Sequence, residues 1–309
     1  MDHVVGPVPS MSILVNTPRS IRRNVMFVAL FLVGVVIWWR WITTLLTLAF
    51  TNEQYSHVLL VLPVSLLLAL LEGRAKNVKP AWSPFPALAL VLVALTTVLA
   101  VQFTTETPGE PALIIGIASL VMFWIGLVML FLGVSTVRQL LFALLFLFLI
   151  VPMPQVVVDK CMVALQVAST QATYALFRGS GVPVLKNGFV LTFPTLDIEI
   201  AKQCSGIRSS LTLLISGMVL AHLYVRSHLG KILLVLAVVP ISIAKNAVRI
   251  FALSMLGMKV NPAFLYGGLH RNGGVVFFLL ALACLAGVLK AVNKCEEWNA
   301  RTSLPAPLV

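Results

Sequence analysis

Residues 111–133 have the sequence PALIIGIASLVMFWIGLVMLFLG, which contains no charged side chain. A helix needs about 20 apolar residues to cross the hydrocarbon core of a bilayer, so this stretch predicts a membrane-spanning helix. Outward from it, similar runs occur near residues 25–49, 58–71, 85–103, 137–151, 205–224, 232–253 and 273–291. The expected fold is therefore an all-α polytopic membrane protein of about eight transmembrane helices.

Composition points the same way. Hydrophobic residues make up 60% of the 309 residues and charged residues only 10%, whereas soluble domains carry roughly 25% charged residues. The net charge is +12, but the basic residues lie mostly in short loops beside apolar runs, which is how membrane proteins are oriented and meet anionic headgroups. We expect membrane lipids as partners and no nucleic acid, since no soluble basic domain is evident.

Cationic loops resist translocation, so the loops richer in lysine and arginine should be cytoplasmic. With the N-terminus inside, every short basic loop falls on the inner side of an eight-span count. This predicts cytoplasmic tails at 1–24 and 292–309 and a single transmembrane domain at 25–291, with an outer segment at 152–204. The expected location is the bacterial inner membrane, with any site on the outer segment facing the periplasm.

Within that outer segment, residues 155–178 are apolar but interrupted by polar side chains such as Asp159, Lys160 and Gln166. We interpret them as an amphipathic helix that lies at the outer interface or packs into the bundle. Residues 181–201, GVPVLKNGFVLTFPTLDIEIA, alternate and contain turn residues. They predict a small extracytoplasmic β-hairpin.

Cys204 stands just before the sixth apolar run, at the expected N-terminus of a helix. The positive end of the helix dipole and the nearby Lys202 and Arg208 favour the reactive thiolate. The alternative is a small residue packed at the start of a helix.

Lys231 is expected at the inner face of the membrane. Arg249 follows it by about 18 residues, or roughly 27 Å of helix, and is therefore expected at the outer boundary of the hydrocarbon. It shares a helix face with Lys245 and Asn246. Snorkelling to the interface is the alternative explanation. His270 lies between glycines just before the last run, and an ordinary polar loop residue is its alternative.

Together these residues supply the groups of thiol-based acyl transfer. A thiol nucleophile needs a base to take its proton, and the developing oxyanion needs a cation or donors. Cys204, His270 and Arg249 can fill those roles, and the span count, made without reference to chemistry, puts all three on one face of the membrane.

Several motifs in order resemble the exosortase/archaeosortase family: YSHVLLVLP at 55–63, VPMP at 151–154, CSGIRSS at 204–210, NAVRI at 246–250 and HRNGG at 270–274. The resemblance implies a membrane cysteine protease or transpeptidase in which Cys204 is the nucleophile, Arg249 stabilises the substrate or oxyanion, and His270 is the acid/base. Its implied substrates are exported proteins that end in a short motif (Pro-Glu-Pro in the bacterial version), an apolar helix and a basic tail. Cleavage through a thioester would pass the acyl group to water or an amine, in a process linked with exopolysaccharide and biofilm matrix.

The substrate-binding residues expected around this site are Tyr55, Ser56, His57, Lys202, Arg208, Asn246 and Arg271. His57 is a second candidate for the base. Lys202 and Gln203 before the cysteine, and Val58 after His57, depart from the family pattern and leave the sorting motif open.

The alternative function is a polysaccharide or lipid transporter or transferase that holds phosphates with Lys245, Arg249 and Arg271, and a third is a structural scaffold for matrix export. Neither assigns a role to Cys204. No metal or cofactor is expected, because the histidines are scattered and form no HExxH motif. The oligomeric state stays open.

Overall fold

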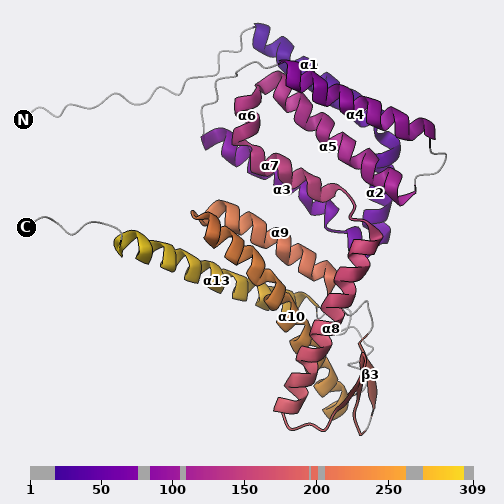
Figure 1. The fold of residues 1–309 in the computed structure, drawn as a ribbon, viewed down its shortest axis with the longest axis vertical. Coiled ribbons are helices and arrows are strands. Elements are labelled where there is room, and N and C mark those ends of the chain that lie inside the picture. The colour runs from indigo at the N-terminus through magenta and orange to yellow at the C-terminus, as the bar shows by residue number, and fades with distance from the viewer. Residues whose placement is uncertain are drawn as a thin grey trace, which may run out of the picture. The chain divides into compact units, whose positions relative to one another are not determined.

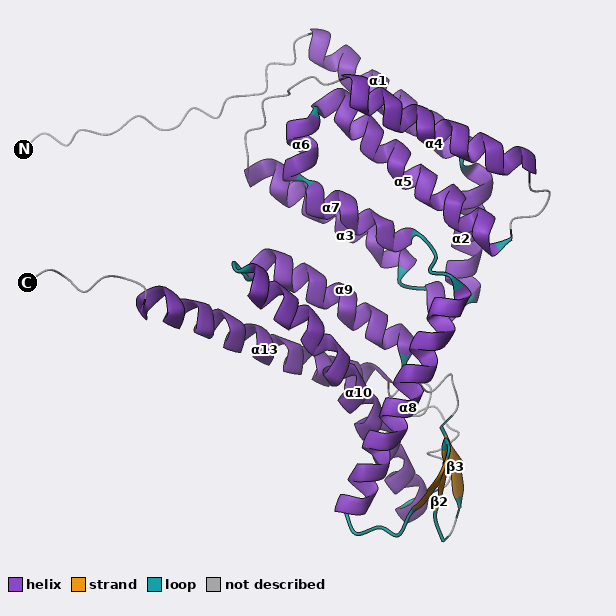
Figure 2. Cartoon of the chain, in the orientation of Figure 1, coloured by secondary structure: helices purple, strands orange, loops and turns teal. Residues whose placement is uncertain are grey.

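The computed structural model describes residues 18–75, 84–104, 109–194, 196–200, 206–261 and 274–302. Helices dominate this part of the chain, and its strands form one small sheet (Figure 2), as the predicted fold class requires. The chain divides into two compact units, Met1–Leu46 with Leu62–Val151 and Thr47–Val61 with Pro152–Val309. The boundaries of the single domain predicted at 25–291 stay a prediction.

The first unit is a bundle of apolar helices (Figure 1). Its elements are α1 (Pro18–Ile37), most of α2 (Trp39–Thr51) and α3 (Val58–Ala75), α4 (Pro84–Thr104), α5 (Glu110–Leu132), α6 (Val134–Gln139), α7 (Leu141–Phe146) and the 3₁₀ turn η2 (Leu147–Ile150). α4 and α5 lie side by side, and Gly126 permits their close approach, since a Cβ there would lie 2.8 Å from Val91. The Ser65 hydroxyl of α3 donates to the carbonyl oxygen of Ala143 in α7 at 2.7 Å.

The region predicted as a single span at 25–49 is not one straight helix, because α1 and α2 meet at an angle of 70°. Trp38 at the break is fully buried, and its indole N–H donates to the Gly116 carbonyl at 3.0 Å and the Ser119 hydroxyl at 2.9 Å in α5. Trp41, also fully buried, covers Gly116, where a Cβ would lie 2.7 Å from its ring. Docking of two indoles on α5 accounts for a bend that a continuous apolar run does not reveal.

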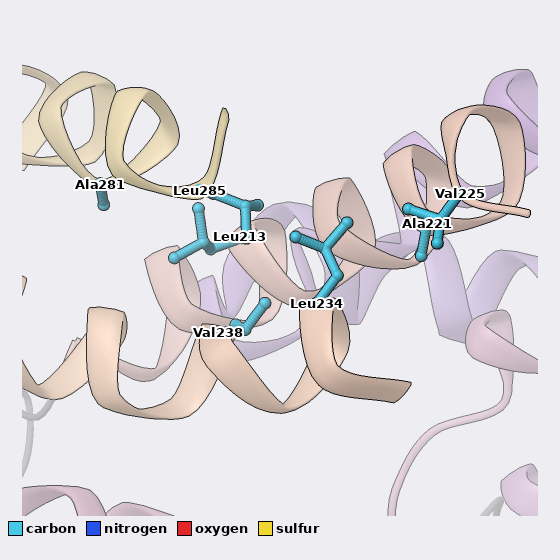
Figure 3. Packing of buried hydrophobic residues seen from close by; sticks show 7 residues of the cluster. All are labelled: Leu213, Ala221, Val225, Leu234, Val238, Ala281 and Leu285. Atoms are coloured by element: carbon cyan, nitrogen blue, oxygen red, sulfur yellow. The ribbon is translucent and has the colours of Figure 1, made fainter. Parts of the chain in front are cut away.

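The second unit contains the 3₁₀ turn η1 (Glu53–Tyr55), α8 (Gln155–Gly179), α9 (Ile207–Tyr224), α10 (His228–Lys259), α13 (Gly274–Thr302) and three short strands. Its first core lies where α9, α10 and α13 meet, and Figure 3 shows its side chains interdigitating between the three helices. Gly217 of α9 packs closely on α10, since a Cβ there would lie 2.8 Å from Val238. The members of this core are Leu213, Ala221, Val225, Leu234, Val238, Ala281 and Leu285.

A second core joins the sheet, α8 and the C-terminal part of α10. Strands β1 (Leu185–Asn187), β2 (Val190–Thr192) and β3 (Asp197–Glu199) form an antiparallel sheet in the order β1-β2-β3. Phe177, Leu191, Phe193 and Ile200 are its buried centre, and residues of α10 from Ile250 onward pack against it. The helix has 32 residues, and about 48 Å of helix is longer than the roughly 30 Å of hydrocarbon, which leaves turns available for this packing.

Most predicted spans correspond to helices, but their count of eight is not confirmed. Within the described residues five helices (α4, α5, α9, α10 and α13) are long and apolar enough to cross a membrane, and the number rises to seven if α1 with α2, and the α7–η2 segment with α8, each form one span. The apolar helix Val58–Gly73 is shorter. Residues 155–178 do form a helix, α8, whose depth in a membrane stays a prediction. The predicted hairpin is present as β1 and β2, with β3 as an additional strand.

Candidate functional site

The predicted site residues divide by their place in the structure. The described ones all belong to the second unit: Tyr55, Ser56, His57, Arg208, Asn246 and Arg249. The remaining ones lie outside the described residues: Lys202, Cys204, His270 and Arg271. The geometry therefore concerns the helices that flank Cys204 in sequence and the polar face of α10.

The start of α9 is fixed by its own first turn. Gly206, two residues after Cys204, caps the helix with φ +71°, a left-handed conformation that glycine adopts without steric cost. The hydroxyls of Ser209 and Ser210 donate to the Gly206 carbonyl oxygen at 3.0 Å and 2.9 Å. The two serines of the CSGIRSS motif thus hold the backbone at the point where the helix begins.

A buried polar turn of α10 packs against this start. Lys245 is 8% exposed and Asn246 is 1% exposed. The Lys245 ammonium donates to the Ser209 hydroxyl. A Cβ on Gly206 would lie 3.2 Å from Asn246 Oδ1 and 3.7 Å from Lys245 Nζ. Two motifs that are far apart in sequence, at 204–210 and 246–250, therefore come into direct contact through their described residues.

Positive charge gathers where these two helices meet. Arg249 is half-buried and follows Lys245 by four residues, about 6 Å further along α10. Arg208 is exposed on the first turn of α9. The N-terminus of a helix carries a partial positive charge of its own. This arrangement favours an anion beside the start of α9, whether thiolate, carboxylate or oxyanion.

The Tyr-Ser-His segment belongs to the same unit. Turn η1 packs against α9, and Tyr55 at its end is buried. The Gln54 side-chain amide donates to the Met162 sulfur of α8 at 3.6 Å. His57 Nδ1 lies 3.0 Å from the Gln54 carbonyl oxygen, to which a protonated Nδ1 donates. These contacts tie the segment to α8 and α9.

Sequence reasoning missed two side chains that shape this region, Ser209 and Gln166. Gln166 of α8 is 4% exposed, and its amide donates to the Ile200 carbonyl oxygen at 2.6 Å. The Ile200 N–H in turn donates to the Phe189 carbonyl oxygen at 2.9 Å. The chain is therefore held from both sides at Ile200, four residues before Cys204. The only signal in the sequence was a polar residue interrupting an apolar run.

Within the described ranges, no three His, Cys, Asp or Glu side chains lie close enough together to hold a metal ion. The expectation that the protein needs no metal and no cofactor stays a prediction, since part of the chain lies outside those ranges.

Comparison with known proteins identifies a family for this chain. The transmembrane exosortase family (Exosortase_EpsH) matches residues 38–287, which is most of the chain and includes all the motifs described above. No curated protein and no solved structure gave a significant match. The match spans both units of the structure. It includes the Tyr-Ser-His segment, the start of α9 and the polar turn of α10 in the second unit. The chain belongs to the transmembrane exosortase family.

Proposed function

We propose that this protein is a membrane-embedded cysteine peptidase or transpeptidase that cuts C-terminal sorting signals from exported, membrane-anchored proteins. Membership of the exosortase family supports the general activity, the processing of sorting signals within the membrane. The finer assignments, to Cys204, Arg249 and His270 at the periplasmic face, are ours. So is the link to exopolysaccharide and biofilm matrix.

The contact between the start of α9 and the polar turn of α10 carries this proposal. It joins Gly206 and Ser209, which follow Cys204 closely, to Lys245 and Asn246, which precede Arg249. A thiol that must react as thiolate gains from a helix N-terminus and from nearby cations. A transporter or a scaffold has no need to combine these groups with a cysteine.

In the proposed reaction the Cys204 thiolate attacks the carbonyl carbon of the scissile peptide bond. A C–S bond forms, and the oxyanion that develops accepts hydrogen bonds from the Arg249 guanidinium. The C–N bond then breaks, and protonated His270 gives its proton to the leaving amine. Water or an acceptor amine attacks the resulting thioester, His270 takes the proton of the attacking group, and the Cys204 thiolate leaves.

The substrate would approach by diffusion within the membrane, anchored by its own helix. Its motif would then present itself at the depth of the cysteine. Carboxylates in that motif would pair with arginine and lysine, for which Arg208, Arg271 and Lys202 are candidates. Tyr55, Ser56, His57 and Asn246 are the proposed uncharged or weakly basic contacts. Both termini would remain cytoplasmic.

The test is co-expression of a tagged candidate substrate with wild-type protein or a variant, followed by measurement of substrate size. Cys204→Ala, Arg249→Ala and His270→Ala should each abolish shortening while the enzyme accumulates normally. Cys161→Ala is the matched control, because this thiol is exposed on α8 and has no role in the proposal. Shortening that persists with Cys204→Ala would refute the thiol mechanism.

Orientation needs a separate measurement. In a variant whose only cysteine is Cys204, a membrane-impermeant thiol reagent should label intact spheroplasts. If labelling requires opening of the inner face, the periplasmic assignment is wrong.

A further inference from the structure

Among the residues that the structure describes, the proposed reaction leaves the buried cation Lys245 without a role. Lys245 is 8% exposed, on a turn of α10 whose neighbouring polar residues Ser242 and Asn246 are also buried. Its ammonium donates to the Ser209 hydroxyl, which itself donates to the Gly206 carbonyl oxygen at 3.0 Å. The charge is therefore held at a defined place, beside the backbone from which α9 begins.

Packing alone does not explain a lysine at this position. Withdrawal of an ammonium from water costs several kcal/mol, and replacing a buried charge by a well-packed apolar residue is often neutral or stabilising. Methionine has similar length and would fill the same space without that cost. Nor is the bond to Ser209 required to hold α9 on α10, because apolar contacts through Leu213 and Val238 already join the two helices.

We infer that Lys245 is a positioning residue that fixes the first turn of α9 through Ser209 and places a positive charge beside the start of this helix, where it favours the anions of the Cys204 reaction. The inference rests on the proposed function and goes beyond it. Ionisable residues retained within membrane helices usually serve function. The other cations of these two segments, Arg249 and Arg208, add to the same field, but each is more exposed than Lys245.

The experiment compares Lys245→Met, Lys245→Arg and Lys259→Met. Lys259 is the matched control, because it is an exposed lysine at the C-terminal end of the same helix. Lys245→Met should unfold in detergent at a temperature equal to or above that of wild type, yet process the tagged substrate about tenfold more slowly or worse. Lys245→Arg should recover most of the rate, and Lys259→Met should match wild type.

A second readout follows the thiol directly. In a background whose only cysteine is Cys204, the rate of alkylation by a small thiol reagent should fall about tenfold with Lys245→Met, because a positive charge is lost beside Gly206, two residues along the chain from the thiol. A structural role alone would not give a loss that arginine restores while the unfolding temperature stays high.

Wild-type processing and alkylation rates in Lys245→Met would overturn the inference. A loss that follows the unfolding temperature and is not restored by Lys245→Arg would overturn it too. If Lys245→Met does not fold, Ser209→Ala is the test. It removes the hydroxyl that accepts the hydrogen bond of the Lys245 ammonium and should slow processing. A wild-type processing rate in Ser209→Ala would contradict the inference. Failure of the proposed function is distinguishable, because then either the wild-type protein leaves the substrate unshortened or Cys204→Ala still shortens it.

Discussion

Alanine at Gly206 tests the contact between the CSGIRSS motif and α10. The residue has φ +71°, and an L side chain in this conformation costs roughly 1–2 kcal/mol. A Cβ there would also lie 3.2 Å from Oδ1 and 3.4 Å from Cγ of the buried Asn246. Asn246 is 1% exposed and would have to shift by a few tenths of an ångström to admit the methyl group, so this crowding should add about 1–3 kcal/mol of destabilisation.

Gly181→Ala separates the two effects. Gly181 has φ +75°, so its backbone strain is similar, but a Cβ there would meet nothing within 4 Å. The gain from a stiffer unfolded chain is also the same for both substitutions. The difference in their stabilities therefore reports the contacts of the added methyl group with Asn246 and Lys245.

We expect Gly206→Ala to be less stable than Gly181→Ala by about 1–3 kcal/mol and to lose substrate processing, while Gly181→Ala processes normally. Thermal unfolding in detergent gives the first comparison and substrate shortening the second. Equal stability and equal processing in the two variants would refute the view that α9 starts in tight contact with the polar turn of α10.

Two further substitutions test contacts elsewhere in the second unit. Gln166→Leu removes a buried donor and leaves the Ile200 carbonyl oxygen without the bond from this amide, so thermal unfolding should show a loss of stability of about 1–3 kcal/mol. The control is Gln171→Leu, at an exposed position on the same helix, and an equal loss of stability there would contradict the reasoning. Glu296→Ala removes the carboxylate that accepts from the backbone N–H and hydroxyl of Ser227 at the start of α10, which should cost about 0.5–1 kcal/mol and speed amide hydrogen exchange there. The control Glu297→Ala, at the neighbouring position, should leave the exchange rate unchanged. Equal exchange rates in the two variants would contradict a stabilising role for Glu296 at the start of α10.

Hydropathy predicted the helices well because burial in lipid leaves a long apolar run. α4, α5 and α9 start and end within a few residues of their predicted spans. It failed at Trp38, where the helix breaks because an indole donates to Gly116 and Ser119 about 80 residues away. A bend set by a distant partner leaves no periodic trace.

The sheet shows a similar limit. Alternation and turn residues within 181–201 predicted a hairpin, which the structure forms as β1 and β2. Strand β3 lies in the same alternating stretch, but its pairing with β2 depends on tertiary contacts, since Ile200 at its end is held by Phe189 and Gln166. Local patterns identify strands better than they identify their number in a sheet.

For the candidate site, sequence predicted which motifs matter but not how they touch. The positions of Lys245 and Arg249 one turn apart were evident from helical spacing. The bond from Lys245 to Ser209 was not, because it joins residues 36 positions apart. The roles of Cys204 and His270 stay predictions.

The continuity of α10 has a consequence for how this protein can vary. The helix packs into two cores. Leu234 and Val238 lie in the core with α9 and α13, and residues from Ile250 onward pack against the sheet core. Lys245 and Asn246 lie between the two. Each residue inserted between the two cores would rotate one part of α10 by about 100° relative to the other part. A single insertion would therefore turn the apolar face of one part out of its core. Seven residues, close to two full turns, would nearly restore the phase. The length of α10 between the two cores can therefore change only by near-whole numbers of helical turns. The direction in which Lys245 and Asn246 face is fixed by the packing of both cores.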